Sequence, residues 1–149
     1  MFKYGHWQFP FEFDPAEWYG FVYRIVDLDS NKEYIGKKQL KSRQRRKVKG
    51  RKNRKVVLKE SNWEKYTGSS KALNAEIESR GKDRFAFYIL SLHETKGSLY
   101  YQEVLTQITE DVLRATLPNG ERKYWNGHIG AVKFVPPAVT EKEKQFRIN

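Results

Sequence analysis

The chain has 149 residues, the size of a single domain, and 38% of them are hydrophobic, which is low but enough for a buried core. It contains no cysteine, so disulfide bonds and thiolate metal sites are excluded. No apolar run approaches the ~18 residues that a membrane helix needs, and residues 1–10 lack the layout of a secretion signal. We therefore expect a cytoplasmic protein without a membrane partner.

The net charge of +11 is concentrated in one segment. Residues 37–59 hold 13 of the 29 basic residues and no acidic residue, which leaves 16 basic and 18 acidic residues elsewhere. This clustering indicates a nucleic-acid-binding element; a solvated loop or a targeting signal is less favoured because the segment lies between two structured segments. The residues expected to contact nucleic acid are Lys37, Lys38, Arg45, Lys47, Lys49, Arg51, Lys52, Arg54 and Lys55.

Residues 1–18 are predicted to form an extended aromatic arm. Its aromatic residues occur at mostly odd spacing, and two prolines interrupt it: Phe2, Tyr4, Trp7, Phe9, Phe11, Phe13 and Trp18, with Pro10 and Pro15. We favour packing of these rings on the main body. A platform on which nucleic-acid bases stack is the alternative.

A β-hairpin is predicted over residues 19–38, where two β-prone aromatic runs flank the polar segment 27–31. In an antiparallel pair, directly opposed residues point the same way, so an even loop places Tyr23 and Tyr34 on one face. An odd loop would separate them. We predict an even loop centred near Ser30–Asn31.

The basic segment that follows has poor apolar periodicity. We expect a short helix or an irregular arm near Gln39–Lys47, and then a loop, because Gly50 and Asn53 break a long helix.

Helix signals follow the basic segment. Ser69 or Ser70 is the expected N-cap and Gly81 the expected stop of a helix that places Leu73 and Ile77 on one face.

A strand and a second helix come next. Arg84–Leu90 is apolar on both faces, which favours an interior strand. A helix from Leu99 to about Leu113, capped by Ser98, is expected to bury one stripe, with Glu103 about 60° beyond its edge. The stripe consists of Tyr101, Val104, Leu105, Ile108 and Val112.

Two short motifs and two later polar residues occur in a familiar order. Phe21-Val22-Tyr23 is a degenerate first motif that keeps the tyrosine, and Tyr34-Ile35-Gly36 is a complete second motif. Glu103 lies on the helix after the predicted strand, and Asn126 follows in Tyr-Trp-Asn. In these residues and their spacing, the chain resembles the GIY-YIG nucleases from about residue 19 to residue 126.

The resemblance implies a role for each of these residues. Tyr23 is expected to be the general base, and Tyr34 to orient it, the water or the phosphate. Glu103 would bind Mg²⁺ or Mn²⁺, since one carboxylate with waters and phosphate oxygens suits such an ion. Gly36 would give DNA room to approach the backbone, and Asn126 would brace the site.

Positive charge is also needed at such a site. A tyrosine has a pKa of about 10, so Tyr23 needs cationic neighbours to act near neutral pH, and Lys37, Lys38 and the arginines of the basic segment are available to supply them. The family's arginine lies on a helix shortly after the second motif. The candidates here are Arg43 and Arg46, with Arg51 and Arg54 if the segment loops out.

We therefore predict an α/β (α+β) domain with a small central three-stranded sheet, antiparallel or mixed, flanked by helices. Its parts are an aromatic arm over 1–18, a GIY-YIG-like domain over 19–135 with a basic insertion over 37–59, and a mobile polar tail over 136–149.

The function implied by the resemblance is divalent-metal-dependent cleavage of DNA, with duplex DNA as the expected substrate. The basic insertion and the arm would have to bind DNA themselves, because a separate specificity domain has no room. We expect a monomer or homodimer of phage-encoded or restriction-like type, located in the cytoplasm of a bacterial host.

Three alternatives stay open. The first is a non-catalytic nucleic-acid-binding protein that keeps the fold, and metal-dependent cleavage separates it from a nuclease. The second is an RNA-directed protein that stacks bases on the arm. The third is a phage assembly component with an incidental basic loop.

Overall fold

The computed structural model describes residues 1–46, 49–50, 52 and 55–148, with residues 43–46 and 55–58 described by their backbone only. Its centre is a five-stranded mixed sheet in the order β1-β2-β7-β3-β4. The strands are β1 (Phe2–Tyr4), β2 (Trp7–Phe9), β3 (Gly20–Asp27), β4 (Glu33–Gln39) and β7 (Phe85–His93). The predicted small mixed sheet flanked by helices is confirmed, although it has five strands rather than three.

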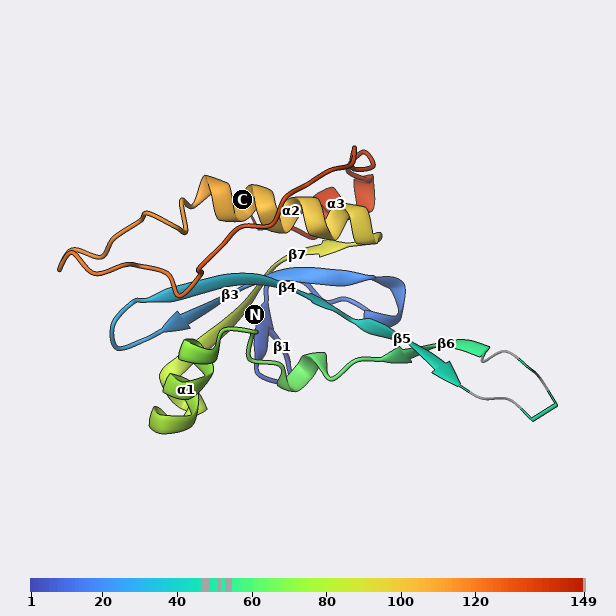
Figure 1. Ribbon diagram of the computed structural model, residues 1–149, viewed down its shortest axis with the longest axis horizontal. Coiled ribbons are helices and arrows are strands. Elements are labelled where there is room, and N and C mark those ends of the chain that lie inside the picture. Colours follow the sequence, from blue (N-terminus) through green and yellow to red (C-terminus); the bar gives the residue numbers. More distant parts are fainter. Residues whose placement is uncertain (47–48, 51, 53–54, 149) are drawn as a thin grey trace.

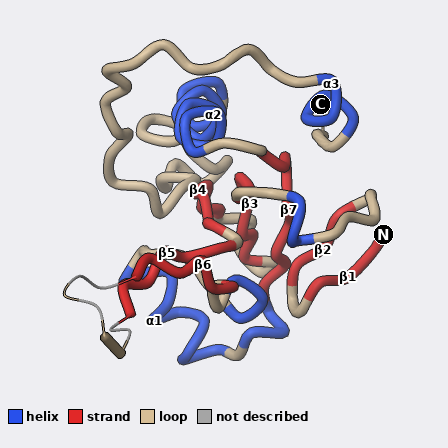
Figure 2. Tube along the Cα trace, turned by 90° about the vertical axis from the view of Figure 1, so that its right-hand side faces the viewer, coloured by secondary structure: helices blue, strands red, loops and turns tan. Residues whose placement is uncertain are grey.

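Helices cover both faces of this sheet (Figures 1 and 2). α2 and α3 lie over one face, and α1 lies on the other. Their bounds are α1 (Lys71–Arg80), α2 (Lys96–Thr109) and α3 (Glu141–Gln145), with short 3₁₀ helices η1 (Pro15–Glu17), η2 (Trp63–Lys65) and η3 (Lys82–Arg84). Within the described ranges, every helix is too short or too polar to cross a membrane.

The two additional strands come from the N-terminal segment. β2 pairs in parallel with β7, with Trp7 opposite Phe87, and β1 pairs antiparallel with β2. Trp7 and Phe9 are fully buried, and the indole Nε1 of Trp7 donates to the carbonyl oxygen of Trp63 at 2.7 Å. The packing interpretation is confirmed for the aromatic residues of this segment except Phe2, which is 44% exposed, and residues 2–9 contribute two strands to the sheet.

The β3–β4 hairpin has the even loop that was predicted. The N–H of Asp27 donates to the carbonyl of Lys32, which closes a four-residue loop centred one residue earlier than expected. The Asp27 carboxylate fixes this centre because it accepts the N–H of Asp29 at 3.0 Å. Tyr23 is opposite Gly36, and Ile25 is opposite Tyr34, so the two tyrosines share a face.

The expectation of a short helix or irregular arm over 39–47 is wrong. β5 (Lys41–Arg46) and β6 (Lys55–Glu60) form a separate antiparallel ribbon that projects from the body (Figure 1). The β-prone run 56–58 supplies a strand that satisfies the backbone groups of β5. The base of the ribbon is fixed by buried Leu40, whose carbonyl accepts the N–H of Ser61 at 2.9 Å.

The first helix and the interior strand are confirmed. The Ser70 hydroxyl caps α1 by accepting the N–H of Leu73 at 3.2 Å, and Gly81 ends the helix at a φ of 95°. β7 is paired on both sides, with β2 and with β3.

The buried face of α2 differs from the prediction. The N-cap is Thr95 rather than Ser98, and the helix ends at Thr109. Within the predicted stripe, Leu105 and Ile108 are 41% and 59% exposed. The stripe is therefore wrong for most of its length: the sheet-facing side carries Leu99 together with polar residues, described below.

The C-terminal segment packs against the body, while its expected mobility stays a prediction. Thr140 and Glu143 form a capping box at the start of α3, and the Phe146 ring lies 5.3 Å from that of Trp18. The N–H of Leu92 donates to the Phe146 carbonyl at 3.1 Å, so the segment continues the hydrogen bonding of β7.

Candidate active site

Two adjoining pockets lie beside β4 and α2. The first has a volume of about 280 Å³ and is lined by Tyr23, Tyr34, Gly36, Lys37, Lys38, Gln39, Tyr66, Ser69 and Glu103. The second has about 200 Å³ and is lined by Tyr34, Lys37, Ser69, Glu103, Gln107, Asn126, Gly127, His128 and Gly130. The structure thus gathers four of the six predicted catalytic residues, Tyr23, Tyr34, Glu103 and Asn126, from β3, β4, α2 and the segment after it.

The two tyrosines lie side by side at the floor of the first pocket. Tyr23 is fully buried and Tyr34 is half-buried, with ring centroids 6.2 Å apart. The Tyr34 hydroxyl is 3.0 Å from the Ser69 Oγ. The Tyr66 ring stands edge-on to Tyr23 at 6.1 Å, which completes an aromatic wall.

Gly36 makes the position of Tyr23 possible. A Cβ atom at residue 36 would lie 2.5 Å from the Tyr23 hydroxyl oxygen and 3.1 Å from Cε1 of Tyr34. The Tyr23 side chain therefore lies directly over the glycine. Room for Tyr23 is a reason for this glycine that does not depend on DNA, while its expected contact with DNA stays a prediction.

The tyrosine hydroxyls are not activated in the protein alone. Burial raises the pKa of Tyr23 well above 10.0, and Tyr66, Tyr34 and Glu103 raise it further. Burial also raises the pKa of Tyr34, although the Ser69 hydrogen bond opposes this. The expectation that nearby lysines lower the pKa of Tyr23 is therefore wrong for the protein alone, and both hydroxyls carry their protons at neutral pH.

Lys37 and Lys38 are paired with other side chains. The Lys37 Nζ is 3.1 Å from Oε1 of Glu103 and 4.2 Å from the centroid of the Tyr100 ring. The Lys38 Nζ lies 4.4 Å from the centroid of the Tyr66 ring, and burial lowers its pKa.

Glu103 faces the sheet from α2, and its side chain is 16% exposed. It already holds a cation, the Lys37 ammonium, so the surroundings suit positive charge. The described residues contain no group of three or more His, Cys, Asp or Glu that could hold a metal. Gln107 lines the same pocket, and its amide oxygen is buried without a described partner. A carboxylate and an amide oxygen are donors that fit a hard divalent ion that keeps several waters.

Asn126 is a buried brace for β4. Its Oδ1 accepts the N–H of Ile35 at 3.1 Å, and its Nδ2 donates to the Ile35 carbonyl at 2.7 Å. The guanidinium of Arg122 donates to the Asn126 carbonyl at 2.7 Å. Since Ile35 lies between Tyr34 and Gly36, these bonds fix the strand that carries the pocket floor.

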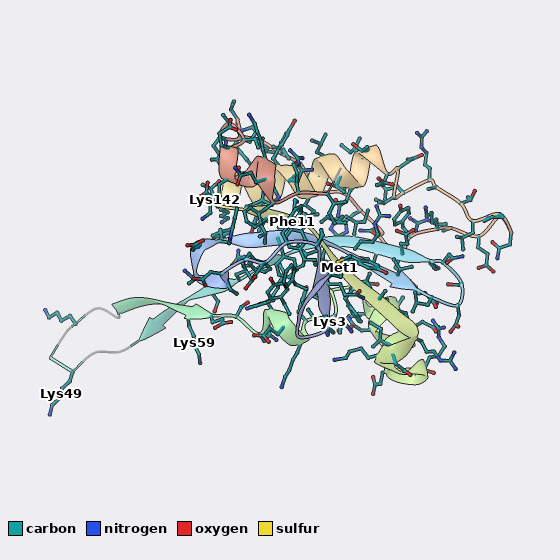
Figure 3. The ribbon with its side chains drawn as sticks, turned by 180° about the vertical axis from the view of Figure 1, so that it is seen from behind. Met1, Lys3, Phe11, Lys49, Lys59 and Lys142 are labelled. Atoms are coloured by element: carbon teal, nitrogen blue, oxygen red, sulfur yellow. The ribbon has the colours of Figure 1, made fainter. Side chains whose placement is uncertain are left out.

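The predicted basic contacts are only partly described. Arg43, Arg45 and Arg46 lie on β5 and Lys55 on β6, by backbone, while Lys47, Arg51 and Arg54 lie outside the described residues. No arginine with a described side chain lines either pocket. Lys49 and Lys52 are exposed, and Figure 3 shows the Lys49 and Lys59 side chains pointing away from the body.

Seven pocket residues had no predicted functional role: Gln39, Tyr66, Ser69, Gln107, Gly127, His128 and Gly130. Ser69 was predicted only as a helix cap. Tyr66 and Ser69 could not be placed at the site from the sequence, because nothing local shows that their turn meets the hairpin. The position of Gln107 beside Glu103 can be inferred from the sequence, because Gln107 follows Glu103 by four residues and so shares its helix face.

A comparison with protein families supplies one match. The family model described as "Putative endonuclease segE, GIY-YIG domain" matches residues 4–129, most of the chain. The match includes part of the N-terminal segment, so it extends further than the resemblance from residue 19. No curated protein and no solved structure matches the chain.

Proposed function

The chain belongs to the GIY-YIG endonuclease family, and from this premise we propose that it hydrolyses phosphodiester bonds of double-stranded DNA with a divalent ion. The family assignment makes this a nuclease domain with DNA as its implied substrate. The observation that carries the proposal is the convergence of Tyr23, Tyr34 and Glu103 on one pocket.

Glu103 is the proposed ligand of the ion, Mg²⁺ or Mn²⁺. The ion would supply positive charge that stabilises the phosphate and the leaving oxygen and favours an ionised tyrosine. Glu103 lines both pockets and would hold the ion there, and Asn126 fixes β4 through its two hydrogen bonds to Ile35.

Tyr23 is the proposed general base, and Tyr34 orients it. Burial raises the pKa of Tyr23 and keeps its hydroxyl protonated in the free protein. We therefore expect Tyr23 to lose its proton only after positive charge has entered the pocket. Cleavage would then require a bound divalent ion. Ser69 holds the Tyr34 hydroxyl at 3.0 Å and so fixes the ring beside Tyr23.

Lys37 exchanges partners in this scheme. In the free protein its ammonium neutralises Glu103. When DNA and an ion enter, the ammonium moves to a backbone phosphate, since it and the ion would repel each other at one carboxylate. The proposed arginine clamp, Arg43 or Arg46, comes from β5, which begins two residues after the pocket residue Gln39.

The basic ribbon supplies the remaining DNA contacts. Its lysines and arginines neutralise backbone phosphates, which gives affinity without sequence information. One site cuts one strand at a time, so a monomer would nick DNA and a homodimer would break both strands.

Cleavage of supercoiled plasmid in Mg²⁺, Mn²⁺ or EDTA tests the proposal. We expect nicked or linear product with an ion and none with EDTA or with Glu103→Ala. Phage and bacterial genomic DNA serve as further substrates, because a rare recognition site can be absent from one plasmid. DNA binding without cleavage on all substrates would instead support a non-catalytic binding protein.

A further inference from the structure

Gln107 is a buried polar residue for which the proposed reaction has so far no use. Its side chain is 5% exposed and lines the second pocket together with Glu103. The amide Nε2 donates to the Ile35 carbonyl at 3.0 Å. That bond assigns the nitrogen and the oxygen of the Gln107 amide. The Ile35 carbonyl oxygen can only accept a hydrogen bond, so the group that faces it must be the NH₂ group.

The oxygen of the amide, Oε1, is buried and has no hydrogen-bond partner among the described residues. A buried acceptor without a partner is costly, and most are satisfied by protein, water or an ion. The Ile35 carbonyl also accepts from Asn126, so bracing of β4 does not require Gln107 alone.

The helix places this oxygen in register with Glu103. Residues four apart on an α-helix share a face, and two side chains at this spacing can bind one ion. Glu103 and Gln107 face the same pocket from consecutive turns of α2. A carboxylate and an amide oxygen are both ligands that suit hard divalent ions.

We propose that Gln107 supplies, through Oε1, the second protein oxygen of the divalent-ion site formed with Glu103. The inference rests on the proposed function, because it deepens the ion site of that reaction. It assigns Gln107 two contacts at once: Nε2 holds β4, and Oε1 faces the ion.

Binding of Mn²⁺ alone, followed by the electron paramagnetic resonance signal of free Mn²⁺, tests this without any cleavage. The variants are Gln107→Leu, which offers no oxygen, and Gln107→Glu, which offers a charged one. Both lose the donor to Ile35, so a purely structural role predicts the same direction of change for both. Gln102→Leu, on the same helix but outside both pockets, is the matched control.

We expect Gln107→Leu to weaken Mn²⁺ binding at least about tenfold, since the loss even of an outer partner that only orients a ligand costs about that much. Gln107→Glu should strengthen it, and Gln102→Leu should leave it unchanged. Circular dichroism and thermal unfolding check that each variant folds. If Gln107→Glu does not fold, an unchanged Mn²⁺ affinity in Gln107→Leu still overturns the inference.

Equal effects of Gln107→Leu and Gln107→Glu, or no effect of Gln107→Leu, would overturn the inference and leave the proposed function intact. A wild-type protein without saturable Mn²⁺ binding, or a Glu103→Gln variant that binds like wild type, would remove the ion site itself. The two failures are therefore distinguishable.

Discussion

A single methyl group at residue 36 would collide with the catalytic arrangement that we propose. The hypothetical Cβ lies 2.5 Å from the Tyr23 hydroxyl oxygen and 2.7 Å from its Cζ, both on a ring that is fully buried. In this chain, the glycine of the family's second motif is therefore required because it leaves room for the Tyr23 side chain.

Gly36→Ala should therefore displace Tyr23. We expect the free energy of unfolding to fall by about 1–3 kcal/mol, typical of overpacking, and cleavage to fall at least about 100-fold. Urea unfolding and plasmid cleavage measure the two effects. Gly130→Ala is the control, because a Cβ there meets nothing within 4 Å; equal losses in both variants would contradict the steric account.

Lys37 competes with the ion for Glu103 in our account. Lys37→Met should raise the affinity of the free protein for Mn²⁺ about fivefold or more, the size of a typical coupling between sites. It should also lower DNA affinity and make its log–log salt dependence shallower by about 0.9. Mn²⁺ titration and fluorescence anisotropy at several salt concentrations measure these changes.

Lys96→Met is the matched control for Lys37→Met. Lys96 also lies over the Tyr100 ring, at 5.3 Å, but lines neither pocket. An unchanged Mn²⁺ affinity in Lys37→Met would show that the ion pair does not compete with the ion.

The β5–β6 ribbon is the element that we expect to hold DNA. Its base is fixed beside the first pocket, where the Ser61 hydroxyl donates to the carbonyl of Gln39 at 2.6 Å. A two-stranded ribbon can enter the major groove of DNA. Contacts made by the ribbon would therefore lie to one side of the bond that is cut.

Lys49→Gln with Lys52→Gln removes two exposed charges of the ribbon. DNA affinity should fall and the salt slope become shallower by up to about 1.8, while the melting temperature stays unchanged. Anisotropy titrations measure the slope. Lys3→Gln with Lys133→Gln, also exposed, should change the slope much less; an equal change would mean that net charge rather than the ribbon binds DNA.

The C-terminal helix α3 is held by a buried polar cluster. Oε2 of Glu143 accepts the Ser98 hydroxyl at 2.7 Å and the N–H of Glu94 at 2.9 Å, and His93 lies beside it at 3.5 Å. Burial alone would raise the pKa of Glu143, but hydrogen bonds from His93 and Ser98 outweigh it and lower the pKa to about 2. The ionised carboxylate therefore stabilises the fold.

The contribution of Glu143 should depend on pH in a defined window. It is fully present above the ordinary pKa of 4.5 and is lost as the pH falls toward 2. Glu143→Gln should lower the free energy of unfolding by about 1–3 kcal/mol at pH 7, with a difference from wild type that shrinks below pH 4.5. A difference that stays constant from pH 7 to pH 3 in urea unfolding would refute the role of the charge.

Local signals predicted the elements that local chemistry controls. The even loop placed Tyr23 and Tyr34 on one face, and the cap at Ser70 and the stop at Gly81 defined α1. These features depend on residues close together in the chain, which a sequence displays directly.

Features that depend on distant partners were missed. Trp7 joins the sheet only because it pairs with Phe87, and no pattern within residues 1–18 specifies that strand. The face of α2 was misjudged because apolar periodicity ignores polar groups that bond to the sheet, such as Gln107 at the Ile35 carbonyl. Polar residues on the buried face of a helix break the apolar pattern, and such exceptions are expected at functional sites.

The most direct test of the whole account compares two tyrosines of one pocket. Single-turnover cleavage of DNA is measured for Tyr23→Phe and Tyr66→Phe at matched saturation by DNA. We predict that Tyr23→Phe loses about 100-fold or more of the cleavage rate, as expected for a general base, with DNA affinity within about twofold of wild type. Tyr66→Phe should retain most of the rate. A Tyr23→Phe variant that cleaves as fast as wild type would contradict the proposed role of this pocket.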